Sequence, residues 1–314
     1  MPPLGRALGS GLYLPAIGRA RLPVHDPRAP GEFLHGSFNS ATGGLDYKLY
    51  VPSRPASTPG PLIVMLHACS QNADDFAVGA AMNVLAEAHD CLVLYPEQSC
   101  QANSSLCWNW FEAEQQGRES RKPALIAGMT REVISRWQGD QYRVYVAGLS
   151  AGGAMAAVMG ATYPDVYAAI GVHSGLPVGT ARDLVSAMAA MKKARTGRGR
   201  LAGKVVKPVL IIVFHGDMDD KVHPYNGEAV LEQFLHPAQG ECNAARRQIQ
   251  HGGGERGFTR TEILDSAGRS VAEYWQLHHA SHAWSGGSAA GSYTNPAGPD
   301  ASAEMLRFFL SQTI

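Results

Sequence analysis

The chain has 314 residues, of which 45% are hydrophobic, enough to build one large α/β domain without help from disulfides or metals. Lysine plus arginine and aspartate plus glutamate each number 27, so the formal net charge is zero and neither a nucleic acid nor an anionic surface is indicated as a partner. No apolar run approaches 18 residues, so the sequence predicts no membrane span.

Residues 1–30 are rich in proline and glycine, a composition that opposes regular structure, and we expect an irregular arm there. The first residues lack the charged and then apolar layout of a secretory signal. Residues 31–314 are expected to form a single domain. Its first segments, 31–38 and 45–51, alternate apolar and polar residues, which is typical of an antiparallel hairpin at a sheet edge.

Short apolar runs then alternate with helix-like segments, which predicts a mostly parallel sheet with helices on both faces. The expected strands are 61–67, 91–95, 142–149, 166–173, 208–214, 259–264 and 271–277. The expected helices are 74–89, 123–137, one directly after residue 150, 182–193, 224–234 and 300–311. Residues 97–122 form a long polar loop, and the basic piece at 195–204 is expected to be a solvated loop or, alternatively, a mobile rim over the site.

The stretch 142–157 joins a strand to a helix through Gly148-Leu-Ser150-Ala-Gly152. The two glycines leave room for strand and helix to pass closely, and the serine hydroxyl is then exposed above the sheet edge. The following N–H lies at a helix N-terminus, where negative charge is favoured. The pattern predicts a nucleophile elbow; the alternative is an ordinary glycine-rich turn.

A serine nucleophile needs a base and a group that holds the base, and in an α/β sheet these lie beyond the carboxyl ends of strands. The loop after strand 208–214 holds three candidate acids: Asp217, Asp219 and Asp220. The loop after strand 271–277 holds three candidate bases: His278, His279 and His282. The order serine, acid, histidine is that of α/β-hydrolases.

Four further histidines lie at strand ends or in nearby loops: His67, His173, His215 and His223. We expect them to hydrogen-bond loop backbone. Neither HxxEH nor HExxH spacing occurs, so no catalytic metal or other cofactor is expected. A tetrahedral oxyanion also needs donors, and we expect one from the N–H of Ala151 and one from the turn 67–71.

Five stretches, in this order, resemble polyhydroxybutyrate depolymerase-type esterases, which are serine hydrolases related to feruloyl and acetylxylan esterases: His67–Phe76, Cys107–Phe111, Gly148–Met155, His215–Val222 and Ser281–Gly287. The resemblance implies an α/β-hydrolase fold with Ser150 as nucleophile, Asp219 as acid and His282 as base. It also implies the N–H of Cys69 as an oxyanion donor. Ala68 stands where the family's His-Gly-Cys-x-Gln has glycine, so a need for positive φ there would alter the turn.

The resemblance further implies a disulfide between Cys69 and Cys107, for which Cys100–Cys107 is a rival pairing. With five cysteines, at least one is free or pairs between chains. Cys91 opens a strand and is expected to be a small buried hydrophobe. A disulfide favours a secreted or periplasmic protein whose export signal is not part of this sequence.

Three tryptophans near the expected triad should contact substrate, with packing in rim or core as the alternative: Trp108, Trp110 and Trp284. The resemblance implies hydrolysis of polyhydroxyalkanoate-type chains or oligomers and short acyl esters through an acyl-enzyme. Feruloyl or acetylxylan esters are the nearest alternative, and a non-catalytic binding relative is an alternative from another class. The sequence stops just after the closing helix, with no added binding module, which makes insoluble polymer a less favoured substrate than short oligomers or soluble esters.

Overall fold

The computed structural model describes residues 26, 28–53, 58–192, 209–235, 245–254 and 257–314. Most of the proline-rich arm (1–25 and 27), the basic piece at 195–204 and Cys242 lie outside the described residues. The division into an arm and one catalytic domain therefore remains a prediction.

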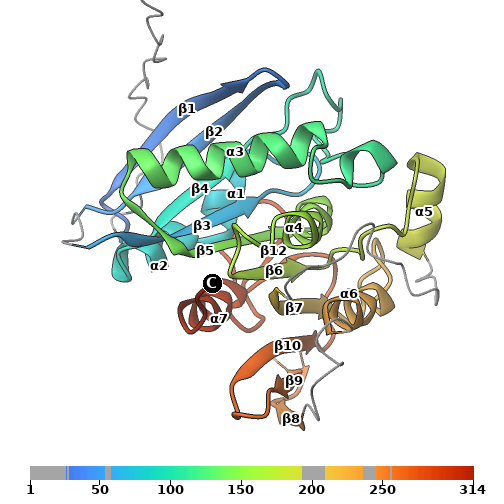
Figure 1. The fold of residues 1–314 in the computed structure, drawn as a ribbon. Helices are drawn as coiled ribbons and strands as arrows, with labels where there is room; N and C mark the ends of the chain where they lie inside the picture. Colours follow the sequence, from blue (N-terminus) through green and yellow to red (C-terminus); the bar gives the residue numbers. More distant parts are fainter. Residues whose placement is uncertain (1–25, 27, 54–57, 193–208, 236–244, 255–256) are drawn as a thin grey trace, which may run out of the picture.

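Ten strands of the described residues form one sheet in the order β1-β2-β4-β3-β5-β6-β7-β10-β9-β8 (Figure 1). The six strands from β4 to β10 in this order are parallel, whereas the pairs at both edges are antiparallel. The predicted mostly parallel sheet with an antiparallel N-terminal edge hairpin is confirmed. The strands are β1 (Glu32–Ser40), β2 (Gly43–Val51), β3 (Gly60–Leu66), β4 (Leu92–Pro96), β5 (Gly139–Leu149), β6 (Ala169–His173), β7 (Leu210–Gly216), β8 (Ala245–His251), β9 (Phe258–Leu264) and β10 (Ser270–Leu277).

Alternate residues of the parallel strands face two hydrophobic layers, one on each side of the sheet. Leu62 and Val64 of β3 belong to the layer covered by α3, α4 and α6, whereas Ile63 and Met65 belong to the layer covered by α1, α2 and α7 (Figure 1). The helices are α1 (Ala73–Ala80), α2 (Met82–Ala88), α3 (Arg121–Arg136), α4 (Ala151–Thr162), α5 (Leu184–Lys192), α6 (Tyr225–Leu235) and α7 (Ala301–Leu310), with a 3-10 turn η1 (Ala113–Gln115) and a short pair β11 (Trp284–Ser285) and β12 (Thr294–Asn295). Helices on both faces are as predicted.

Several elements differ from the prediction, among them the helix after β3, strand β8 and the short pieces η1, β11 and β12, which were not predicted. The expected helix 74–89 is divided at Ala81, whose φ of 53° is left-handed, so that α1 ends and α2 begins there. Strand β8 was not predicted, because its sequence is polar and mostly exposed. Within the described ranges, every helix is too short or too polar to cross a lipid bilayer.

Candidate active site

Ser150 occupies the turn between strand β5 and helix α4. Its backbone has φ 57° and ψ −116°, a conformation that non-glycine residues seldom adopt and that costs about 1–3 kcal/mol. Two main-chain hydrogen bonds hold the turn: the Ser150 N–H donates to the carbonyl of His173, and the Ser150 carbonyl accepts from the N–H of Ala154, each at 2.9 Å. The serine is therefore presented at the carboxyl end of β5.

Two glycines flank this turn because three elements meet there. A Cβ on Gly152 would overlap the carbonyl oxygens of Leu66 and His67 at the end of β3. A Cβ on Gly148 would overlap the backbone of Gly152. Any larger residue would push α4 away from β3, which is why the strand, tight turn and helix need glycine at both positions.

Asp219 lies in the turn that follows strand β7, and only 7% of its surface is exposed. Its Oδ1 accepts hydrogen bonds from the N–H groups of Lys221 (3.0 Å) and Val222 (2.8 Å). Its Oδ2 accepts from Nδ1 of His282 at 2.7 Å. These three bonds fix the plane of the carboxylate and direct Oδ2 at the histidine.

The carboxyl of Asp219 is ionised although it is buried. Burial opposes the charge, but hydrogen bonds from His215, whose Nε2 lies 3.4 Å from Oδ2, and from His282 outweigh it and hold the pKa of Asp219 well below its usual value. An ionised Asp219 orients the histidine and stabilises a positive charge on its ring. The other two candidate acids, Asp217 and Asp220, are exposed.

His282 lies in the loop after strand β10, with 10% of its side chain exposed. Because Nδ1 donates to Asp219, the neutral ring carries its lone pair on Nε2, which has no hydrogen-bond partner among the described residues. Nε2 can therefore accept a proton. The neighbouring histidines are placed elsewhere: Nε2 of His278 lies 2.9 Å from Thr259 Oγ1, and His279 is exposed.

The structure joins His282 to Asp219 but not to Ser150. In the part of the chain that the structure describes, no hydrogen bond links the Ser150 hydroxyl to Nε2 of His282. Both residues follow the carboxyl ends of parallel strands, which meet at one edge of the sheet. Catalytic hydrogen bonds of resting enzymes are often long and tighten when substrate binds.

The turn after strand β3 is anchored by side chains. The N–H of Ala68 donates to Gln71 Oε1 (3.0 Å), and Gln71 Nε2 donates to the carbonyl of Ser292 (2.9 Å). The positive φ of this turn, 62°, belongs to Ser70 and not to Ala68. Alanine in the place of glycine therefore introduces no backbone strain here.

The backbone N–H groups of Cys69 and Ala151 have no acceptor among the described residues. Ala151 is the first residue of α4, where a helix N–H has no intrahelical partner. Cys69 lies in the turn after β3, the strand next to β5. Both N–H groups are thus available to an oxygen that carries negative charge.

A disulfide joins Cys69 to Cys107, so the predicted pairing is confirmed and the rival pairing is wrong. The N–H of Ser70 also donates to the carbonyl of Ser105 at 2.7 Å. The loop 97–122 is therefore tied to the turn after β3 by a covalent bond as well as by hydrogen bonds. The free cysteines of the described residues are Cys91, which is buried as expected, and Cys100, which is exposed.

A family model described as "Esterase PHB depolymerase" matches residues 45–254, more than half of the chain. The chain belongs to the Esterase PHB depolymerase family. The match includes Ser150, Asp219 and the disulfide, and His282 lies beyond it.

Relatives that the chain matches are named as depolymerases or as acetylxylan esterases. The chain is 34% identical to poly(3-hydroxyalkanoate) depolymerase C of Paucimonas lemoignei over 208 residues, which cover 63% of this chain and 50% of that protein. It is 29% identical to poly(3-hydroxybutyrate) depolymerase of Ralstonia pickettii over 271 residues, 78% of this chain and 53% of that protein. It therefore spans about half the length of these two proteins. A probable acetylxylan esterase A of Aspergillus clavatus is 28% identical over 235 residues, 70% of this chain and 75% of that protein.

Solved structures resemble the fold of this esterase-family chain. An acetyl xylan esterase from Aspergillus awamori matches with a TM-score of 0.67 at 18% identity, covering 88% of this chain and 98% of that one. An S-formylglutathione hydrolase from Agrobacterium tumefaciens matches with a TM-score of 0.58 at 12% identity, covering 92% of this chain and 97% of that one. At such identities the likeness concerns the fold alone, and it confirms the predicted α/β-hydrolase architecture.

The tryptophans expected to contact substrate are buried. Trp108 and Trp284 expose none of their surface and Trp110 exposes 6%. The indole N–H of Trp108 donates to the carbonyl of His67 (3.1 Å), and that of Trp284 donates to Ser302 Oγ (3.0 Å). The prediction that Trp108 and Trp284 contact substrate is therefore wrong for this structure, and the alternative of packing in the core holds. Both rings are buried, and each uses its one polar atom in a hydrogen bond there.

The four remaining histidines bind loop backbone, as predicted. Each ring meets at least one backbone group: His67 the N–H of Gln98 (3.1 Å) and the carbonyl of Ala68 (2.7 Å), His173 the N–H of Ser285 (3.1 Å), His215 the carbonyl of Val222 (2.9 Å) and His223 the N–H of Tyr225 (3.3 Å). Burial lowers the pKa of His67 to about 4, so that ring is neutral. No three of the described His, Cys, Asp or Glu side chains gather so that they can hold a metal ion.

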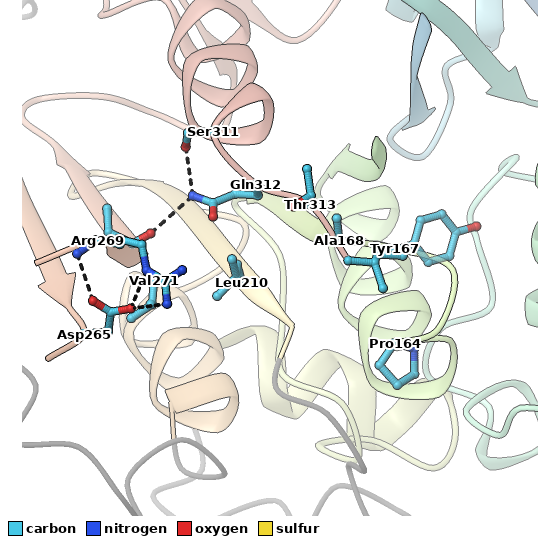
Figure 2. A pocket seen from close by; sticks show the side chains of 12 residues that line it. Pro164, Tyr167, Ala168, Leu210, Asp265, Arg269, Val271, Ser311, Gln312 and Thr313 are labelled. Atoms are coloured by element: carbon cyan, nitrogen blue, oxygen red, sulfur yellow. Dashed lines mark hydrogen bonds and ion pairs between the residues drawn. The ribbon is translucent and has the colours of Figure 1, made fainter. Parts of the chain in front are cut away.

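A cavity of about 480 Å³ lies at the other edge of the sheet (Figure 2). Its lining includes Leu210 and Ser270, the first residues of β7 and β10, whose carboxyl ends carry the acid and the histidine. Figure 2 shows that its charged groups meet each other, because Arg269 Nε donates to Asp265 Oδ2 at 2.8 Å. This cavity is separated from the candidate site by the length of the strands.

Proposed function

We propose that this chain is a serine carboxylic-ester hydrolase that works through an acyl-enzyme on Ser150. The observation that carries the proposal is the pair of His282 and Asp219. A buried, ionised carboxylate holds Nδ1 at 2.7 Å and leaves Nε2 without a partner among the described residues. A histidine so arranged is the base that a serine needs in order to lose its proton at neutral pH.

In the first half-reaction, Nε2 of His282 takes the proton of Ser150 Oγ while Oγ attacks the carbonyl carbon of the ester. The carbonyl oxygen becomes an oxyanion that accepts hydrogen bonds from the N–H groups of Cys69 and Ala151, and one such donor contributes about 3–4 kcal/mol. The bond to the alcohol oxygen then breaks, and His282 gives its proton to the departing alkoxide. The acyl group stays on Oγ.

In the second half-reaction, a water molecule gives a proton to Nε2 of His282 while its oxygen attacks the acyl carbon. The bond to Ser150 Oγ breaks, Oγ takes the proton back, and the carboxylic acid leaves. Asp219 stays ionised throughout, because its pKa lies well below its usual value, and its charge balances the imidazolium in both halves.

The substrates we propose are polyhydroxyalkanoate-type chains or oligomers and short acyl esters. The family description and the names of two relatives support this class. The name of a third relative, matched over 75% of its length, supports acetylxylan esters as the alternative, with feruloyl esters beside them. The disulfide supports a secreted or periplasmic location, because such bonds persist in oxidising compartments.

Fluorophosphonate labelling and the turnover of p-nitrophenyl butyrate test the chemistry. The wild type should take up a label at Ser150 and hydrolyse the ester. Ser150→Ala should take up none and should lower kcat by at least about 10³-fold with an unchanged circular dichroism spectrum, because only binding and the oxyanion donors still contribute. A wild-type chain that takes no label and hydrolyses no ester would instead be a binding relative of the fold.

Competing substrates test the substrate class. Under the proposal, kcat/KM is higher for soluble hydroxybutyrate oligomers than for acetylated xylan or ethyl ferulate. The opposite order would overturn the substrate class and leave the esterase assignment in place.

A further inference from the structure

His173 is the last residue of strand β6, and none of its surface is exposed. Strand β6 lies between β5, which ends at the nucleophile turn, and β7, which ends at the turn of the acid. The main-chain carbonyl of His173 accepts the N–H of Ser150 at 2.9 Å. The strained turn that presents the serine is therefore anchored on the end of β6.

The ring of the same residue contacts the loop that carries His282. Nε2 of His173 accepts the N–H of Ser285 at 3.1 Å, a short way along the chain from His282. The ring also stacks on Trp284, with centroids 5.2 Å apart and 27° between the planes. His173 thus bonds the nucleophile turn through its backbone and the histidine loop through its side chain.

The hydrogen bond to Ser285 requires a neutral ring. Burial, reinforced by His215 and His282, lowers the pKa of His173 to about 3, although the charge of Asp219 acts in the opposite direction. Nε2 therefore keeps its lone pair at neutral pH. The hydrogen lies on Nδ1, which faces Ser174 Oγ at 3.2 Å.

Two other anchors of the histidine loop lead away from the main sheet, whereas the N–H of Met218, in the turn after β7, also donates to the carbonyl of Ala280 in this loop (3.1 Å). The N–H of Trp284 donates to the carbonyl of Tyr293, and Ser285 Oγ donates to the carbonyl of Pro299, each at 2.7 Å. These bonds hold the loop to the segment that precedes α7. The bond to His173 instead reaches the parallel sheet, at the strand beside the nucleophile turn.

We propose that His173 is a positioning residue, which sets the distance between the Ser150 hydroxyl and Nε2 of His282. This proposal rests on the proposed function. When the ring contact is lost, the histidine loop shifts relative to the serine turn, and a displacement of about 1 Å between reacting groups lowers the rate by about 100-fold. The surfaces that bind substrate stay in place, so kcat falls and KM does not rise.

The test compares His173→Phe with His173→Gln in the hydrolysis of p-nitrophenyl butyrate. Phenylalanine keeps a flat ring against Trp284 but accepts no hydrogen bond from Ser285, whereas glutamine places an oxygen where Nε2 was. We expect H173F to lower kcat by about 10- to 100-fold with KM within about threefold of the wild type, and H173Q to restore kcat to within about threefold. Phe214→Leu is the control. It removes the other ring stacked on His173, 5.8 Å away, leaves both hydrogen bonds in place and should leave kcat unchanged.

Counting the sites labelled by fluorophosphonate gives kcat per folded molecule, so a loss of folded protein is not mistaken for a loss of rate. A kcat of H173F within about twofold of the wild type, or equal losses in H173F and H173Q, overturns the proposal. If phenylalanine prevents folding, His173→Met, which is apolar and flexible, replaces it with the same expectation. Wild-type protein that takes no label and hydrolyses no ester overturns the proposed function and this proposal with it.

Discussion

The two ends of the parallel strands differ in how their polar groups are hydrogen-bonded. We call the end at which these strands finish the carboxyl edge of the sheet and the end at which they begin the amino edge. At the carboxyl edge, Asp219 is fully hydrogen-bonded, and it orients a histidine whose Nε2 has no partner among the described residues. The N–H groups of Cys69 and Ala151 likewise have no acceptor among the described residues. These unfilled groups are the ones that the proposed reaction uses.

At the amino edge, a cavity of about 480 Å³ contains polar groups that satisfy one another. Asp265 is bonded to Arg269 (2.8 Å), and Gln312 Nε2 donates to the carbonyl of Ser270 (3.2 Å). The two edges therefore differ in the hydrogen-bonding capacity that is oriented and left open.

The largest difference between the two edges is expected from a matched pair of substitutions. Asp219→Asn removes the charge that orients His282, so kcat for p-nitrophenyl butyrate should fall by about 10²- to 10⁴-fold. Asp265→Asn removes a charge that is paired with Arg269 at the amino edge and should leave kcat unchanged. Steady-state kinetics of both variants measure this, and similar losses in the two would break the distinction between the edges.

Removal of the disulfide, which lies at the carboxyl edge, is expected to have an effect of intermediate size, a loss of stability. Its two cysteines are separated by 38 positions, for which loop closure predicts a stabilisation of about 4 kcal/mol. The double variant Cys69→Ser/Cys107→Ser should lose about that free energy of unfolding in urea. Its kcat should fall too, because the Cys69 N–H is less firmly placed.

The exposed free thiol gives the control for this experiment. Cys100→Ser should change neither the free energy of unfolding nor kcat. A double variant that loses stability but keeps the wild-type kcat would argue against Cys69 as an oxyanion donor.

The smallest effect per group concerns pH and two neutral histidines at the carboxyl edge. Burial lowers the pKa of His67 to about 4 and that of His173 to about 3, whereas both take up protons near pH 6.5 in the unfolded chain. Between pH 7 and 5 the unfolded state therefore gains protons that the folded state does not. Above pH 6.5 the two rings are neutral in both states, so the free energy of unfolding has its full value there. It should fall by about 2 kcal/mol per histidine from pH 7 to pH 5.

Urea unfolding at pH 7, 6 and 5 measures this dependence. His67→Gln should reduce the fall by about half, and substitution of the exposed His89 by glutamine should leave it unchanged. A free energy of unfolding that stays constant from pH 7 to 5 would mean that both buried rings titrate equally in the folded and unfolded states.

The fold and the nucleophile turn are predictable from sequence because they rest on local patterns. Continuous apolar runs mark the buried parallel strands, and Gly148 and Gly152 mark the close approach around Ser150. Spacing alone leaves three candidate acids after β7. The choice of Asp219 comes from the resemblance, since it depends on which carboxylate the turn N–H groups surround, as those of Lys221 and Val222 do here.

The parts that the sequence does not reveal depend on distant contacts. Trp284 is close to His282 in the chain, yet it is buried because Ser302 of α7 meets its indole N–H. The helix break at Ala81 follows Gly79, whose carbonyl accepts the N–H of Ser288, more than 200 positions away. Neither partner is visible in a local pattern of apolar and polar residues.

Strand β8, the outermost strand on its side of the described sheet, affects how the protein behaves at high concentration. It pairs with β9 on one side and is mostly exposed. Two of its side chains are arginines, and they meet carboxylates: Arg246 that of Glu232 (2.9 Å) and Arg247 that of Glu262 (2.7 Å). Charged, hydrated side chains on an edge strand disfavour the addition of a strand from a second molecule. The sheet thus ends in a sequence that opposes aggregation.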